Sequence, residues 1–184
     1  GWASLKAVDN PGKIIEVGPL EFQTIDEWLS MRLPNGKRIW YRDPQIRMGM
    51  PQWHQPKVFN PKDEKTWKYE DCAAGTCRCE RQRQLTYMKS KNKQWVRTNT
   101  YGGKLTENAT QATSREVLIP AMFHARDAGY PIILTVYDEI VCEVPNGHGS
   151  PEELVEIMRE SPGPWAEVWP INVSAWEGGR YKKD

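Results

Sequence analysis

The sequence lacks several features that would place it in a membrane, secreted or strongly charged class. None of its apolar runs approaches the ~20 residues that a membrane-spanning helix needs, and its first residues show no signal-peptide pattern. Its net charge is only +1, from 25 basic and 24 acidic residues, so the field of the whole molecule does not indicate nucleic-acid binding. These absences predict a soluble, cytoplasmic protein without a membrane partner. With 184 residues, the chain is long enough for one sizeable domain.

Cysteine is scarce, with four residues in the chain, and three of the four lie close together. Cys72, Cys77 and Cys79 form a C-x4-C-x-C cluster, and disulfides are not expected in an intracellular protein. These thiols, with His54 as a fourth ligand, are a candidate structural Zn²⁺ site. The spacing is tighter than in common zinc modules, so free thiols in a surface insertion are the favoured alternative. Cys142 lies in a strand-like run, where we expect a small core residue.

Three zones follow one another along the chain. Residues 1–56 contain one helix-like and four strand-like segments, and the strand-like residues 28–33 and 38–41 flank an Asn-Gly turn. Residues 57–100 are basic and poor in aliphatic side chains, so we expect an irregular insertion with little core of its own. Residues 101–184 have the pattern helix, strand, strand, helix, strand. The zones predict an α+β fold: a small antiparallel sheet with helices on one face and a β-rich N-terminal extension.

The elements of the last zone have clear boundary signals. A helix is expected over about 105–128, with Pro120 inside it as a kink or interruption and Gly129 as its C-cap. Ser150 is the expected N-cap of a second helix, because a proline and a glutamate follow it at the positions that favour a helix start. The final strand is expected over 169–175.

Two acidic residues join the two strand-like runs of this zone. Tyr137, Asp138 and Glu139 separate the runs at 131–136 and 140–144, both rich in β-branched residues. A hairpin of this kind presents both acids at its tip, where their carboxylates can be offered to a hard cation such as Mg²⁺. Acids are also common in solvated turns, which is the alternative explanation of the pair.

Three segments that stand in a fixed order carry a family resemblance. They are residues 101–112, residues 136–144 and residues 178–181. Together they resemble the C-terminal half of the palm of family A DNA polymerases, most of all the phage branch of the DNA polymerase I group. In that family the acidic hairpin is called motif C. The resemblance implies that Asp138 binds the two catalytic Mg²⁺ ions and that Glu139 is an auxiliary group beside it.

The same resemblance implies a DNA-binding face around the hairpin. Tyr137 stands where the family usually has His, and a phenol can still hydrogen-bond the primer terminus. Gln111 matches a glutamine that tests base pairing from the minor groove, and Asn108 is one residue out of register with the family's asparagine. Lys104 and Arg115 are candidate phosphate contacts. For Arg115, an ordinary solvated helix face is the favoured alternative.

Two motifs of the family do not occur in the sequence. Motif A would supply a second metal-binding Asp, and motif B a helix whose Lys grips the incoming dNTP; two metal ions need both aspartates. The sequence therefore predicts the C-terminal palm subunit of a split polymerase that acts on primer–template DNA. It would be inactive until an N-terminal partner supplies thumb, fingers, motif A and motif B. The alternatives are a non-catalytic DNA- or polymerase-binding palm remnant that acts through the basic insertion, and a domain excised from a longer polymerase.

Tryptophan is abundant, with nine residues. Trp40, Trp53, Trp67 and Trp95 flank or lie within the basic zone. Aromatic side chains interleaved with Lys and Arg can stack on single-stranded bases, but tryptophans are as often the core of a small β-rich region. The sequence leaves both explanations open.

Overall fold

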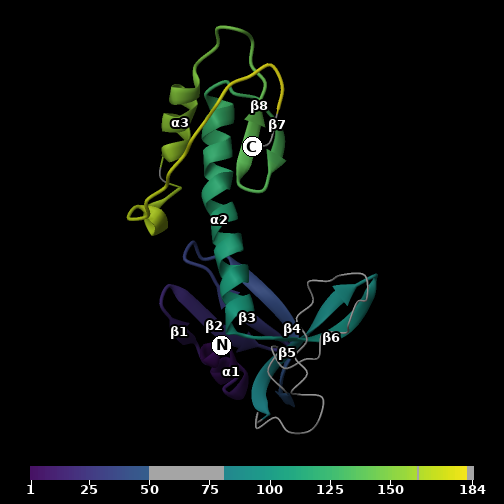
Figure 1. The fold of residues 1–184 in the computed structure, drawn as a ribbon. Coiled ribbons are helices and arrows are strands. Elements are labelled where there is room, and N and C mark those ends of the chain that lie inside the picture. The colour runs from purple at the N-terminus through teal and green to yellow at the C-terminus, as the bar shows by residue number, and fades with distance from the viewer. Residues whose placement is uncertain (50–80, 161, 182–184) are drawn as a thin grey trace, which may run out of the picture. The chain divides into compact units, whose positions relative to one another are not determined.

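The structure is a computed structural model that describes residues 1–49, 81–160 and 162–181 (Figure 1). The chain divides into two compact units. The first consists of Gly1–Arg32 and Arg38–Leu105, and the second of Leu33–Lys37 and Thr106–Asp184. Helices and antiparallel strands are both present, which confirms the α+β fold class.

The first unit is built around a six-stranded antiparallel sheet in which each strand pairs with the next along the chain (Figure 1). The elements are α1 (Trp2–Asp9), β1 (Ile15–Val17), β2 (Leu20–Ile25), β3 (Trp28–Arg32), β4 (Arg38–Gly49), β5 (Gln82–Lys91) and β6 (Gln94–Thr100). The helix and the first four strands agree with the sequence-based expectation, although β4 extends eight residues beyond the expected end at Tyr41.

The irregular structure expected over 57–100 is wrong for residues 82–100, because these form β5 and β6. The segment has few aliphatic residues, but an antiparallel strand needs to bury only one of its faces. Leu85, Thr86 and Thr100 are buried here, while most of the remaining side chains are exposed or half-buried. Low aliphatic content therefore did not prevent strand formation.

One face of the sheet forms the core of the first unit. Its buried side chains are Phe22, Thr24, Leu29, Met31, Tyr41, Leu85 and Thr100. The helix α1 packs on this face through Ala3 and Ala7, which are small enough to let its backbone approach the sheet. Thr24 Oγ1 donates a buried hydrogen bond of 2.9 Å to the Ala7 carbonyl oxygen. The opposite face of the sheet carries arginines, tryptophans and small polar residues.

The turn between β3 and β4 uses the Asn-Gly pair that the sequence indicated. Leu33 N donates to the Lys37 oxygen at 2.8 Å, and Gly36, with φ of 87°, donates to the Leu33 oxygen at 2.9 Å. The turn belongs to the second unit, and its side chains bind α2 (Gly102–Asp127). Asn35 Nδ2 and Lys37 Nζ lie 2.8 and 2.6 Å from Glu116 Oε2.

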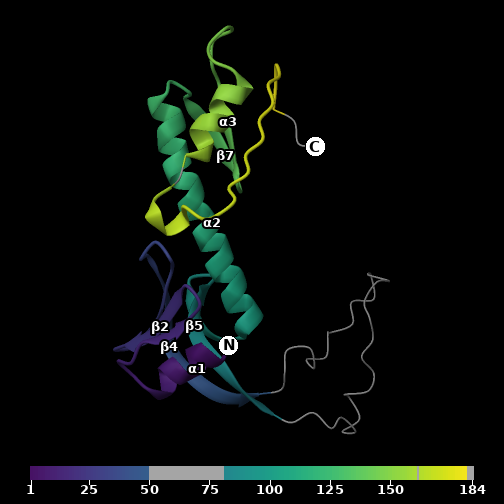
Figure 2. The same cartoon turned by 90° about the vertical axis from the view of Figure 1, so that its left-hand side faces the viewer.

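The second unit contains most of α2 and the elements that follow it (Figure 2). These are the hairpin of β7 (Ile132–Val136) and β8 (Glu139–Cys142), the helix α3 (Pro151–Arg159) and the 3₁₀ turn η3 (Pro164–Ala166). The helix α2 runs through Pro120 without interruption. The final strand expected at 169–175 is not found, and the second sheet consists of β7 and β8. Pro170 removes one ladder donor from that segment, and most of its side chains are exposed.

The end of α2 is a hydrogen-bonded reversal centred on Gly129. Gly129 N donates to the Arg126 oxygen and Tyr130 N to the Ala125 oxygen, both at 3.0 Å. With Gly129 at φ of 90°, this is the Schellman pattern of helix termination. Ala125 and Tyr130 are both buried. The C-cap predicted from the sequence is confirmed, and it turns the chain back into β7.

The start of α3 also matches its sequence signals. Ser150 Oγ accepts a hydrogen bond from Glu153 N at 3.1 Å, and Pro151 is the first helical residue. Its apolar side chains Leu154, Ile157 and Met158 are half-buried. The helix thus has a well-formed start but a thin interface.

Substitution of Gly129 with Ala tests the reversal. The added Cβ would lie 3.3 Å from His148 Cε1, and a φ of 90° is strained for any L residue. We expect a loss of about 1 kcal/mol or more in the free energy of unfolding, measured by urea denaturation with circular dichroism. Gly179→Ala is the control, since no atom lies within 4 Å of its added Cβ. Equal losses in both variants would contradict this role of Gly129.

Candidate metal and DNA-binding site

The acidic residues lie at the tip of the β7–β8 hairpin, as the sequence predicted. Val136 pairs with Glu139, so Tyr137 and Asp138 form a two-residue turn. Tyr137 is 91% exposed and has φ of 55°, an unfavourable conformation for a bulky residue. The favoured two-residue hairpin turns have a positive φ at their first central residue, so the turn itself imposes this conformation on Tyr137. Asp138 and Glu139 are exposed to solvent.

A bulge in β7 shapes the hairpin below its tip. Ile132 pairs with Cys142 and Leu134 with Val141, so Ile133 is an extra residue on its strand. Ile133 is 60% exposed. Cys142, expected to be a core residue, is only half-buried, and this burial raises the pKa of its thiol. The bulge increases the local twist and so changes the direction of the side chains that follow it.

Glu139 has a partner that sequence reasoning missed. Tyr181, in the tail that follows Gly178 and Gly179, donates a hydrogen bond of 3.0 Å from its hydroxyl to Glu139 Oε2. The hydrogen bond to the carboxylate raises the pKa of Tyr181 above its usual value. The tail was part of the family resemblance, but no local pattern could indicate this contact, because the two residues are 42 positions apart.

The candidate DNA contacts on α2 share one helical face. Lys104, Asn108, Gln111 and Arg115 follow one another at intervals of four, three and four residues, which places them in one row along the helix. Lys104, Gln111 and Arg115 are exposed and Asn108 is half-buried. Gln111 Nε2 donates to Glu107 Oε1, a residue of the same face, at 3.4 Å. The row therefore presents amides, two cations and one carboxylate.

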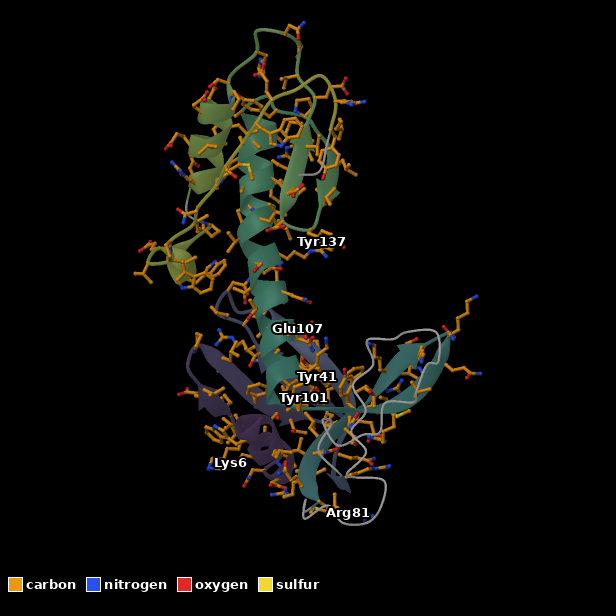
Figure 3. All side chains as sticks on the ribbon, viewed as in Figure 1. Lys6, Tyr41, Arg81, Tyr101, Glu107 and Tyr137 are labelled. Atoms are coloured by element: carbon orange, nitrogen blue, oxygen red, sulfur yellow. The ribbon has the colours of Figure 1, made fainter. Side chains whose placement is uncertain are left out.

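The reversal at Gly129 turns the chain back so that the hairpin runs beside α2. Figures 1 and 2 show the hairpin beside α2, and Figure 3 shows Tyr137 beside the helix that carries Glu107. The stretch from Tyr130 to Tyr137 extends about 23 Å at ~3.3 Å per residue. That length equals the rise of about 15 helical residues at ~1.5 Å each. Counted back from Asp127, this length reaches about residue 112 of α2.

The hairpin tip provides some of the ligands that a magnesium site needs. Among the residues that the structure describes, no group of three or more His, Cys, Asp or Glu side chains is arranged to hold a metal ion. Mg²⁺, however, usually takes only one or two carboxylates and completes its shell with substrate phosphates and water. Asp138 and Glu139 provide donors of this type. The candidate zinc ligands Cys72, Cys77, Cys79 and His54 lie outside the described residues.

The second unit exposes large apolar side chains over a thin core. Its buried apolar residues are mostly small: Ala109, Ala121, Ala125 and Ala166, with Leu33 and Tyr130. In contrast, Ile133 and Leu134 of β7 are 60% and 47% exposed, and Val168 is 89% exposed. Apolar surface of this kind commonly marks a contact with further protein.

The described residues thus form an α+β chain in which an acidic hairpin lies beside the long helix α2 (Figures 1 and 2). Over 183 residues, 99% of this chain, it is 31% identical to a DNA polymerase of Bacillus phage SP02, and it spans 24% of that relative's length. No family model matches the chain, and no solved structure matches it. No helix in the described part is long and apolar enough to cross a membrane. The chain is therefore related to a segment of a phage DNA polymerase.

The strain at Tyr137 can be isolated by comparing two substitutions. Tyr137→Gly and Tyr137→Ala both remove the ring, but only Ala keeps a Cβ at positive φ. We expect the Gly variant to be the more stable by about 1 kcal/mol in urea unfolding. When Thr135, within β7, is replaced by Gly or by Ala, the Ala variant should be the more stable, since Gly weakens an ordinary strand. The same order at both positions would contradict a strained turn.

The contact between Tyr181 and Glu139 predicts a titration effect. Glu139→Gln should lower the pKa of Tyr181 towards its usual value, because a charged acceptor holds the hydroxyl proton more strongly than a neutral amide. The stability from this bond is complete below the ordinary tyrosine pKa of about 10 and is lost as the pH rises through the raised value. NMR titration of ring-labelled tyrosine measures the shift. Glu143→Gln is the control, and equal effects of both variants would exclude the contact.

Proposed function

We propose that the chain carries motif C of a phage-type family A DNA polymerase and that Asp138 is a ligand of its catalytic Mg²⁺. What supports the proposal is that the hairpin with Asp138 in its turn lies beside α2, the helix that carries Gln111 and Arg115 (Figures 1 and 2). Sequence similarity to a phage DNA polymerase over 99% of the chain supports it. Neither an acidic turn nor a polar helix face alone would be specific for a polymerase.

The chemistry of nucleotidyl transfer explains why these groups belong together. When bound, Mg²⁺ stabilises negative charge on the attacking and leaving oxygens of the transferred phosphate. Asp138 would contribute a carboxylate from a short, two-residue turn, which limits its freedom to move. The hydrogen bond from Tyr181 would orient Glu139 beside it. Tyr137, held at the tip, would contact the primer terminus through its phenol.

The face of α2 would bind the duplex next to the hairpin. The minor groove presents acceptors at similar positions for every base pair, so the Gln111 and Asn108 amides would sense pairing without reading sequence. Lys104 and Arg115 would contact phosphates, which position the duplex. Binding of primer–template DNA should therefore be salt-sensitive.

The remaining functions would come from protein outside this sequence. Neither motif A nor motif B occurs in the 184 residues, and the relative is about four times as long as the matched segment. Thumb, fingers, the second aspartate and the dNTP-binding lysine would lie on a partner polypeptide or on further parts of the same polypeptide. The exposed Ile133 and Leu134 are the surface against which such a part would pack. The assembled enzyme would act in the cytoplasm of the phage host.

Asp138→Asn is the decisive substitution, because it keeps the size of the side chain and removes the charge that binds metal. In primer extension by the chain assembled with the segments that carry motifs A and B, we expect a loss of at least about 100-fold. Asp127→Asn is the matched control, an exposed carboxylate at the end of α2 that pairs with Arg126. Extension at the unsubstituted rate by Asp138→Asn would refute the assignment and favour a non-catalytic palm remnant.

A further inference from the structure

The face of the six-stranded sheet that points away from α1 carries an unusual set of side chains. Its central positions hold arginines and tryptophans, which we name together the arginine–tryptophan face: Trp28, Arg38, Trp40, Arg42, Trp95 and Arg97. All six belong to strands of the first unit, β3, β4 and β6.

The strand register places these residues on one surface. Arg42 is opposite Trp28 on β3 and opposite Met88 on β5, and Met88 is opposite Arg97 on β6. These four residues form a row across β3, β4, β5 and β6. Side chains two positions apart along a strand share a face. Trp40, Arg38 and Trp95 therefore join the row on the same side.

The tryptophans of this face are not core residues. Trp40 is 47% exposed and Trp95 is 53% exposed. The Arg42 guanidinium lies 4.8 Å from the centroid of the Trp95 ring and 5.9 Å from that of Trp28. This stacking holds the rings of two strands at fixed positions, with part of the Trp95 surface still open to solvent.

The face carries more positive than negative charge. Two arginines on or beside the face are paired with carboxylates: Arg32 with Glu21 at 2.6 Å, and Arg97 with Asp43. Arg38 donates to Ser30 Oγ at 2.6 Å. Within the described residues, no carboxylate is paired with Arg38 or Arg42. These cations are held by neutral groups and remain available to an anion.

The use of arginine rather than lysine restricts the kind of anion that this face can bind. The positions of β3 to β6 on this face carry arginine but no lysine. A guanidinium can bind phosphate with two parallel hydrogen bonds and can also stack on aromatic rings and bases. A sheet face that only contacts water does not require arginine in place of lysine, and it does not require half-exposed tryptophans.

We infer that the arginine–tryptophan face binds single-stranded DNA. Unpaired bases can stack on exposed aromatic rings while arginines follow the phosphates, whereas a duplex keeps its bases inside the stack. Four strands span about 14 Å, a width at which known sheet platforms stack two or three bases. The choice of DNA over RNA rests on the proposed polymerase function.

Fluorescence anisotropy with a labelled oligo(dT) tests the stacking. Trp40→Ala and Trp95→Ala should each weaken binding by about tenfold, while Trp40→Phe should retain most of the affinity because it keeps a ring. Trp2→Ala is the matched control, since Trp2 is 56% exposed in the same unit but lies on α1. Circular dichroism confirms that each variant is folded.

Salt titration of the same binding tests the charges. Arg42→Gln should reduce the slope of log affinity against log salt by about 0.7, the value for one phosphate contact on a single strand. Lys89→Gln removes an exposed cation of β5 from the opposite face and should leave the slope nearly unchanged.

Three results would overturn the inference. The first is unchanged affinity of Trp40→Ala and Trp95→Ala. The second is duplex DNA binding as tightly as oligo(dT) with the same dependence on both tryptophans, and the third is tighter binding of oligo(U). The assay contains no Mg²⁺, dNTP or primer terminus, so its failure would leave the assignment of Asp138 intact. Failure of the primer extension test would likewise leave single-strand binding intact.

Discussion

The reversal at the end of α2 is the constraint on which the candidate site depends. Two hydrogen bonds, from Gly129 N and Tyr130 N to the last turn of the helix, turn the chain back on itself. The strand that follows then runs beside α2 (Figures 1 and 2), and its length decides where the tip ends. A hairpin one or two residues shorter would end beside a more C-terminal part of α2. The geometry of the site is thus set by one helix cap and a count of residues.

The two units differ in how much of their stability they can supply themselves. The first buries Phe22, Leu29, Met31, Tyr41 and Leu85 between a six-stranded sheet and α1. The second has a core made mainly of alanines and a two-stranded sheet, an element that is marginal without further packing. Its large apolar side chains point outward on β7. A segment that matches 24% of a longer polymerase would have such a surface if the rest of that protein covered it.

Local patterns in the sequence predicted the elements whose signals are local. The caps at Gly129 and Ser150 and the acidic turn at Asp138 follow from a few adjacent residues. The strands over 82–100 were missed because their burial is shared with other strands. The strand expected at 169–175 was wrong, since this segment pairs with no strand of the described residues. The contact of Tyr181 with Glu139 and the row from Trp28 to Arg97 depend on register between distant segments, including the irregularity between Arg42 and Gln45. No single stretch of sequence carries that information.

The most direct test of the central claim is photo-crosslinking from a primer whose 3′-terminal nucleotide carries a photoreactive group. The complex would contain this chain, the segments that complete the polymerase and a template, and mass spectrometry would identify the crosslinked peptides. If the hairpin tip lies at the primer terminus, crosslinks should form at Tyr137 and Asp138, and a second probe in the minor groove should label residues 108–115 of α2. Crosslinks confined to α3 or to the first unit would contradict the claim.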